Sequence, residues 1–276
     1  MSAFVGTGAL TRLALRLDRV RLAVWILSLV AVTLVFGAAI GDLYPTVAAR
    51  RQLELSIAAN PALTAVLGPA FDLATVGGLV AWRMGFLPLV LVPLMALLAV
   101  VRHTRAEEET GRQELVGSTV VGRRAPLTAA LLVAAAASLA IGVLVAVGLV
   151  VMGEAVGGSV ALGGSYVAAG WMFAAVAAVA AQITESARAA GGIAGTVLGL
   201  SYLVRGVGDA AGEGGLSALS WVSPLGWVLH VRAFAGERWW VLGLALALVA
   251  VLVAAAYGLV ARRDLGAGLL PARLGP

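Results

Sequence analysis

Charged side chains are scarce in this sequence. Asp, Glu, Lys and Arg together make up 12% of its 276 residues, whereas 61% of the residues are hydrophobic. A soluble domain carries about 25% charged residues and about 45–50% apolar ones. The chain therefore has too few polar side chains to cover a water-facing surface, and this excludes a soluble enzyme.

Cysteine and lysine are both absent. Without cysteine the chain has no disulfide, no thiolate metal site and no cysteine nucleophile. Without lysine it cannot carry a Walker A motif, whose lysine reaches the nucleotide phosphates, so it is not itself an ATPase. His103 and His230 fall on opposite sides of the membrane in the topology predicted below, and neither H-E-x-x-H nor G-x-S-x-G occurs. We expect no catalytic residue, no metal site and no cofactor bound by this chain.

What the chain has in abundance is apolar sequence in blocks of membrane-spanning length. An α-helix needs about 20 apolar residues to cross a hydrocarbon core about 30 Å thick. These blocks predict an all-α integral membrane protein with about six transmembrane helices, forming a single transmembrane domain over residues 1–276. The predicted spans are 22–41, 79–101, 127–152, 166–184, 191–204 and 239–260.

The arginines are distributed unevenly over the predicted connections. Thirteen of them fall on the side that holds both termini, five fall on the other side, and Arg83 lies within the second block. Positive residues are concentrated in cytoplasmic loops, so both termini are predicted to be cytoplasmic, in a multi-pass protein of the plasma membrane. The net charge of +5 is explained by this topology, and we expect the lipid bilayer, not nucleic acid, as the partner of the basic residues.

The connection 102–126 is the most charged part of the sequence. Thr104 is predicted to cap a short helix, with Glu107 completing a capping box and the following glutamates in its first turns, where negative charge suits the helix dipole. One interpretation is a solvated loop whose charges only fix topology. The other is a docking helix that lies along the membrane surface and fits a groove on a cytoplasmic partner.

This connection resembles the loop after the second span of ABC-2 type transporter permeases. Residues 107–115 read EEETGRQEL, and STVVGR follows at 118–123, with Val120 where the family commonly has proline. In that family the segment is a coupling helix that contacts a separate ATP-binding subunit, which holds the ATP and Mg²⁺. The resemblance assigns this coupling role to Glu107, Glu108, Glu109, Gly111, Arg112, Glu114 and Leu115.

Two later segments are similar to actinobacterial permeases that export polyketide antibiotics. They are SWVSPLGWVLHVRAFAGERWW at 220–240 and RRDLGAGLLP at 262–271. The resemblance implies export of hydrophobic or amphipathic compounds such as polyketide antibiotics. Those permeases usually contain two such halves in one polypeptide, and this chain contains one. It is then a half that forms a homodimer, a half that pairs with another chain, or a truncated gene product.

The segment before the last span is rich in aromatic residues. Tryptophans at a membrane surface anchor helices at the level of the lipid headgroups. The family resemblance adds that this segment forms a short re-entrant helix near the exit of the pathway, and the two interpretations are compatible. The residues concerned are Trp221, Pro224, Trp227, Trp239 and Trp240.

Two further groups of residues suggest motion or packing. Arg83 in the second span either extends to the outer membrane surface or lines a pathway, and Pro88 and Pro93 would kink that span, which suits a gate. Gly191, Gly195 and Gly199 form a small-residue stripe on the fifth span. Packing within the chain is the expected use of this stripe, and a dimer contact is the alternative.

Three functions other than export differ in what they require of the sequence. A secondary transporter driven by an ion gradient would need acidic residues inside its spans, and the predicted spans contain none away from their ends. An intramembrane enzyme would need paired catalytic groups at one depth, and none are found. A membrane scaffold without transport activity differs from an exporter only by the resemblance of the coupling loop, so it stays an alternative.

Overall fold

A computed structural model describes residues 2–58, 60–110, 121–212 and 214–262, and within these ranges the chain forms helices and no strands. Among the described residues, six helices are long and apolar enough to cross a membrane, which confirms an all-α membrane protein. These six are α2 (Arg19–Leu43), α6 continued through α7 (Leu87–Glu109), α9 (Ala125–Val151), α10 (Val156–Ile183), α11 (Ala187–Ala210) and α14 (Trp240–Val260).

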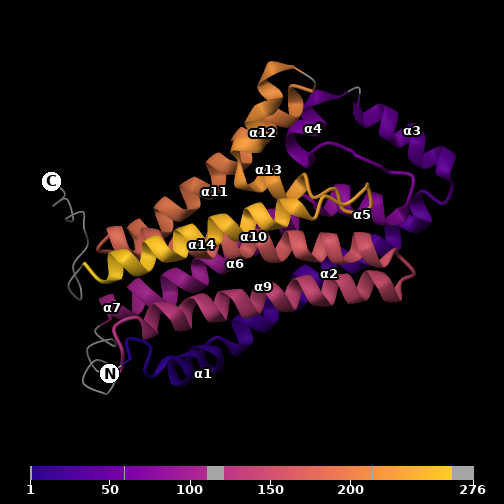
Figure 1. The fold of residues 1–276 in the computed structure, drawn as a ribbon. Helices are drawn as coiled ribbons and strands as arrows, with labels where there is room; N and C mark the ends of the chain where they lie inside the picture. Colours follow the sequence, from indigo (N-terminus) through magenta and orange to yellow (C-terminus); the bar gives the residue numbers. More distant parts are fainter. Residues whose placement is uncertain (1, 59, 111–120, 213, 263–276) are drawn as a thin grey trace.

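Shorter helices lie at the two ends of this bundle (Figure 1). At one end, called here the α1 end, α1 (Thr7–Leu17) precedes the first span and α7 (Glu107–Glu109) ends the second. The opposite end is called the α3 end. It holds α3 (Val47–Ala58), α4 (Pro61–Leu67), α5 (Val76–Met84), the 3-10 turn Gly215–Ser217, α12 (Ala218–Val222) and α13 (Pro224–Leu229).

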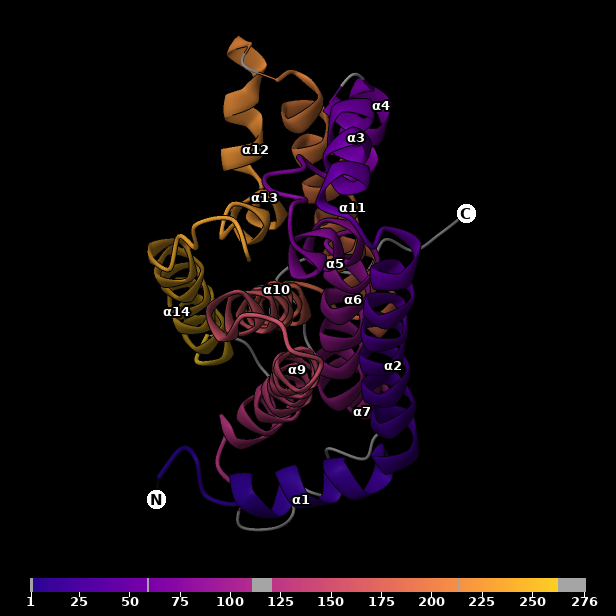
Figure 2. The same ribbon diagram turned by 90° about the vertical axis from the view of Figure 1, so that its right-hand side faces the viewer.

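Helix α10 occupies the centre of the bundle (Figure 2). It packs against α6, α9, α11 and α14. Of the residues in its 18-residue apolar stretch, 72% are buried, the largest share among the six spans. Its composition explains this position, because glycine, alanine and serine let neighbouring backbones approach closely in a membrane. At the crossing with α9, a Cβ added to Gly142 would lie 2.5 Å from the carbonyl oxygen of Gly163. The two helices therefore meet backbone against backbone.

Helix α1 lies across the end of the bundle, at a large angle to the spans (Figure 2). It exposes Leu13 and Leu17 together with Arg12 and Arg16. Apolar and basic residues combined on one short helix are typical of helices that lie in a membrane interface. This helix occupies the arginine-rich start of the chain, ahead of the first predicted span.

Three predicted spans differ from the observed helices. The second block is divided at Gly85–Phe86 into α5 and α6, because the backbone turns there and Pro88 opens the new helix. The fourth span begins at Val156, ten residues before the prediction, since its glycine-rich start is helical. The fifth extends to Ala210, beyond the predicted end at residue 204. The other three match the predicted blocks to within about three residues.

Candidate coupling site

The second span continues past the end of its hydrophobic block. Helix α6 passes through a π-helical turn, Arg102–Ala106, directly into α7. The Thr104 hydroxyl donates to the carbonyl oxygen of Val100 at 2.7 Å, as a residue inside a helix does. The prediction that Thr104 caps a new helix is therefore wrong, because no residue before it interrupts the preceding apolar helix. The three glutamates end a helix instead of opening one.

Negative charge at the carboxyl end of a helix is unfavourable, because it opposes the helix dipole. Here one of the glutamates has a cation beside it. The Arg105 side chain is fully buried, and its Nη1 atom donates to Oε2 of Glu108 at 2.7 Å. Its Nε atom donates to the carbonyl oxygen of Ala181, near the end of α10. This arginine therefore joins the acidic end of the second span to the fourth span.

Glu109 reaches the start of the fifth span. Its Oε1 atom accepts a hydrogen bond of 2.7 Å from the backbone N–H of Ala187, the first residue of α11. The Ser186 hydroxyl accepts from the N–H of Ala189 in the same turn. The first N–H groups of a helix have no partner within the helix, and its positive dipole end favours a carboxylate. Glu109 and Ser186 together cap α11.

A second polar cluster joins the first two spans. Asp18, between α1 and α2, is 2% exposed, and its carboxylate lies 3.1 Å from Nε of Arg102 and 2.7 Å from Nε2 of His103. Asp18 was missed by the sequence analysis. One signal is visible in retrospect, since Asp18 is the only acidic residue among the arginines that precede the first span.

The chain that follows the charged connection is held by the N-terminal segment. The N–H groups of Gly122 and Arg124 donate to the carbonyl oxygens of Val5 and Ala3, at 2.9 and 3.0 Å. The Arg124 guanidinium lies over the Phe4 ring and also over the Tyr257 ring of α14. Residues on both sides of 111–120 are thus fixed at the α1 end of the bundle.

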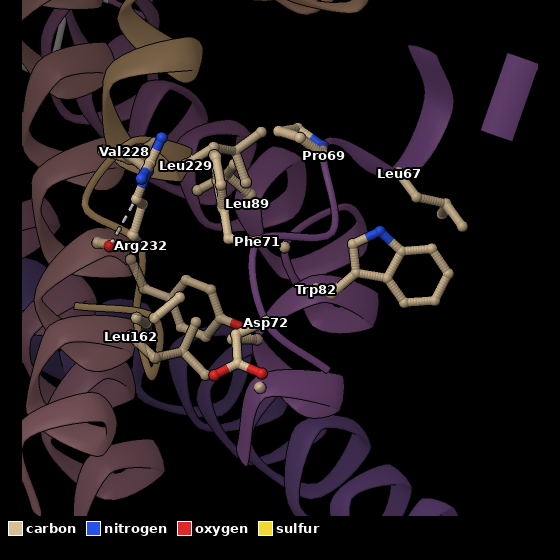
Figure 3. Close-up of a pocket in the computed structure, with 17 residues that line it drawn as sticks. Leu67, Pro69, Phe71, Asp72, Trp82, Leu89, Leu162, Val228, Leu229 and Arg232 are labelled. Atoms are coloured by element: carbon tan, nitrogen blue, oxygen red, sulfur yellow. Dashed lines mark hydrogen bonds between the residues drawn. The ribbon is translucent and has the colours of Figure 1, made fainter. Parts of the chain in front are cut away.

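The α3 end contains a separate small cavity, shown in Figure 3. Its volume is about 40 Å³, and it lies among α5, α10 and the segment between α13 and α14. Arg232 contributes to its lining, with the guanidinium carbon 4.4 Å from the centre of the Phe71 ring. Nearby, the buried pair Arg205 and Asp209 joins α11 to α4 through the carbonyl oxygens of Ala65 and Val66.

Comparison with known proteins bears on what this arrangement does. No family model matches the chain. Over 275 residues, 99% of its length, it is 48% identical to the multidrug efflux system permease protein Rv1217c of Mycobacterium tuberculosis. The chain is a homologue of an efflux permease. It spans about half the length of this curated relative, 49% of it, and the resemblance to export permeases predicted from the sequence is confirmed.

In this permease homologue the predicted coupling residues fall into two groups. Glu107, Glu108 and Glu109 end the second span at the α1 end. Glu108 pairs with Arg105 of the same span, and Glu109 contacts the fifth span. The other four predicted residues lie outside the described part of the chain. These four are Gly111, Arg112, Glu114 and Leu115. Contact with an ATP-binding subunit stays a prediction for both groups.

The predicted gate residues occupy different places in the permease homologue. Arg83 lies in the last turn of α5, outside the six spans, with its side chain exposed. Pro88 lies in the first turn of α6, where a proline removes no helical hydrogen bond, and the predicted span is broken just before it, at Gly85–Phe86. Pro93 lies inside α6, as expected from the sequence. A role as a gate stays a prediction for these residues.

The glycine stripe of the permease homologue faces away from its own helices. A Cβ added to Gly191, Gly195 or Gly199 meets no heavy atom of the described residues within 4 Å. Packing of this stripe against the described part of the chain is therefore not observed. Helix α11 packs inward through Ala194 and Leu198, which leaves the glycines exposed or half-exposed. A contact with a second chain stays a prediction.

The aromatic segment forms two short helices at the α3 end, α12 and α13. They are separated at Ser223, which caps α13, and Pro224 occupies the first turn of α13. Trp227 Nε1 donates to the carbonyl oxygen of Trp221, whose ring stacks on Trp240 with centroids 5.6 Å apart. Trp239 lies just before α14 with 47% of its surface exposed. Re-entry of this segment into the membrane stays a prediction.

Proposed function

We propose that this chain is the transmembrane half of an ATP-driven ABC-2 type exporter. The observation that carries the proposal is the polar connection at the α1 end, where Arg105, Glu108 and Glu109 join the second span to the fourth and fifth. A force applied to the segment that follows Glu109 would act directly on these three spans. The identity with a multidrug efflux permease supports the same function.

In this proposal a separate ATP-binding subunit binds ATP and Mg²⁺ and docks at the α1 end. The contact surface includes residues 107–115, and the α1 end is cytoplasmic, as the arginine distribution predicts. The chain itself supplies no phosphate-binding lysine. Hydrolysis by the partner would then drive the membrane part between two arrangements of its spans.

The export pathway is proposed to lie between this half and a second one. Helices α2, α6 and α11 form one side of the bundle (Figure 2), and the three glycines of α11 are open to a partner. A groove of about 370 Å³ between α2 and α6 has apolar walls with Arg21 and Arg102 at one end. Sites for drug-sized molecules measure about 300–1,000 Å³. Such a groove suits a hydrophobic or amphipathic compound, with polyketide-like molecules the proposed class.

A secondary transporter receives no support from the spans as observed. The longer α11 brings Asp209 into the fifth span, which the sequence analysis did not expect. This carboxylate lies 3.0 Å from Nη1 of Arg205 and accepts a hydrogen bond from Ser220. An acid paired in this way is a structural contact, whereas ion coupling needs a carboxylate that exchanges its partner.

Co-purification tests the proposal. The tagged chain is expressed with candidate ATP-binding subunits, extracted in mild detergent and analysed by mass spectrometry. The charge-reversal variant Arg112→Glu with Glu114→Arg is compared with wild type, because it leaves Arg105, Glu108 and Glu109 themselves unchanged. Asp42→Arg, an exposed residue at the α3 end, is the matched control.

An ATP-binding subunit retained by wild type and by the control, and lost from the charge-reversal variant, is the expected result. Failure to recover any ATPase with wild type would overturn the ABC assignment and favour the scaffold. Equal retention by all three proteins would remove the 107–115 segment from the contact surface.

A further inference from the structure

The cavity at the α3 end combines an apolar wall with one cationic side chain. Its lining includes Phe71, Trp82, Leu162, Leu229 and Arg232. At about 40 Å³ it is far smaller than the pockets that enclose drug-sized molecules, which start at about 300 Å³. It has room for a functional group of a ligand, and the rest of such a ligand would extend out of the cavity.

The charge of Arg232 is not matched by a carboxylate. No Asp or Glu of the described residues lies within ion-pair distance of its guanidinium, and its Nε atom is buried without a hydrogen-bond partner. Asp72 also lines the cavity, but its Oδ1 atom accepts from the N–H of Ala74 at 2.8 Å. Figure 3 shows the Asp72 carboxylate at a different edge of the cavity from Arg232.

Neighbouring groups increase the local excess of positive charge. Burial lowers the pKa of Arg232, and the positive charge of Arg238 lowers it further. His230 contacts the edge of the Phe71 ring, and its Nδ1 atom is also buried without a partner. Buried polar atoms normally have hydrogen-bond partners, so these two atoms near the Phe71 ring have unused capacity to bind a polar group of a ligand.

The backbone holds Arg232 in this position against its intrinsic preference. Arg232 has a φ of 55° and Phe234 a φ of 64°, in the left-handed region that non-glycine residues rarely adopt. Strained backbone of this kind persists only where the surroundings impose it, and it is concentrated at ligand sites. The guanidinium is therefore placed against the Phe71 ring by the fold itself.

We propose that this cavity is an oxyanion-binding site, in which the Arg232 guanidinium binds a carboxylate or phosphate group of an amphipathic ligand. Arginine presents parallel N–H groups that match two oxygens of such an anion, and Phe71 holds the guanidinium plane from one side. The apolar wall would contact the part of the ligand next to the anion. The site needs no ATP-binding partner, so it is tested separately from the proposed export function.

The experiment measures ligand binding to the purified full chain in neutral detergent by tryptophan fluorescence. Trp82 lines the cavity and the Trp221 ring contacts His230, so both are placed to report occupancy. The probes are benzoate, inorganic phosphate, and short-chain phosphatidylglycerol, with short-chain phosphatidylcholine as the zwitterionic control. Arg232→Gln is compared with wild type and with Arg51→Gln, an exposed arginine at the same end.

We expect a saturable response in wild type and in Arg51→Gln, weakened at least tenfold in Arg232→Gln. Arg232→Lys, which keeps the charge and loses the paired N–H groups, should lie between the two. The probe that responds identifies the source of the anion, a carboxylate, a free phosphate or a lipid headgroup. No saturable response to any probe, or equal midpoints in wild type and Arg232→Gln, would overturn the proposal. Equal thermal midpoints of the variants, measured without ligand, verify that they are folded.

Discussion

Oε1 of Glu109 lies 2.7 Å from the backbone nitrogen of Ala187 and accepts its hydrogen bond. The two residues are the last of the second span and the first of the fifth. The same carboxylate occupies the unfavourable end of one helix and the favourable end of another. The contact therefore stabilises the pair of helices only while they stay together, which is the property expected of a connection that transmits movement.

Removal of this carboxylate should loosen the α1 end without unfolding the bundle. Glu109→Ala leaves the N–H of Ala187 without its partner, and we expect a loss of about 1 kcal/mol, the size of a helix-cap effect. Thermal unfolding in detergent measures the change, with Asp42→Ala as an exposed acidic control. An unchanged midpoint in Glu109→Ala would show that water replaces the carboxylate at no cost.

Two glycines on different helices should differ strongly in their sensitivity to replacement by alanine. Gly142→Ala places a methyl group 2.5 Å from the carbonyl oxygen of Gly163, so α9 and α10 must separate. We expect a loss of about 1–3 kcal/mol, as for other overpacked cores. Gly195→Ala meets no heavy atom of the described residues within 4 Å and should change stability by less than about 0.5 kcal/mol.

The measurement for both glycine variants is thermal unfolding of the single chain. The variant Gly195→Leu, with a larger side chain, tests whether the glycine face of α11 contacts a second chain. It should fold normally and yet fail to associate if the α11 face forms the contact. A normal oligomer from Gly195→Leu would exclude this face.

The sequence was sufficient for the membrane class because hydrophobic length is a local property. Two predictions of detail differ from the structure. Thr104 looked like a cap because an acid follows it at the right spacing, but the apolar helix before it continues. The glycine stripe looked internal because small residues usually pack, and only the arrangement of α11 on α6 and α10 shows that it faces outward.

The polar connections between spans could be predicted only in part. The glutamates were identified from their similarity to a known loop, whereas Asp18 and Arg205 carried no such signal. Asp18 contacts His103, 85 residues later, and Arg205 contacts Ala65, 140 residues earlier. Pairings over such separations depend on how the spans assemble, and a single sequence contains no local pattern that specifies them.

The buried pair Arg205 and Asp209 should be essential to the α3 end. Both side chains are 2% exposed, and Arg205 Nη2 also donates to the carbonyl oxygens of Ala65 and Val66 in α4. Breaking a buried pair from one side leaves an uncompensated charge, which costs about 3–5 kcal/mol. We therefore expect Asp209→Leu to reduce the folded yield strongly, as measured by size-exclusion chromatography.

The double variant Arg205→Met with Asp209→Leu provides the control for that loss. It removes both charges, so the remaining penalty should be smaller than for Asp209→Leu alone. If the double variant is recovered less well than the single one, the hydrogen bonds from Arg205 to α4 dominate, and the ion pair is secondary.

Acidification should destabilise the aromatic segment through His230. Burial lowers the pKa of this imidazole from 6.5 to about 4, and the charges of Arg232 and Arg238 act in the same direction. Between those pH values the unfolded chain binds a proton that the folded chain does not, so folding stability falls as pH decreases. Above about pH 7 the imidazole is neutral in both states and contributes no pH dependence.

The variant His230→Gln isolates this effect from the titration of carboxylates. Glutamine is polar and does not ionise. The thermal midpoint of wild type should therefore fall relative to that of the variant as the pH decreases from 7 to about 4. Below that range the folded protein is protonated as well, and the difference should become constant. If the thermal midpoints of wild type and variant differed by the same amount at every pH, the imidazole would be as accessible to protons in the folded chain as in the unfolded one. Its contact with the Trp221 ring, at 4.4 Å between centroids, would then open readily.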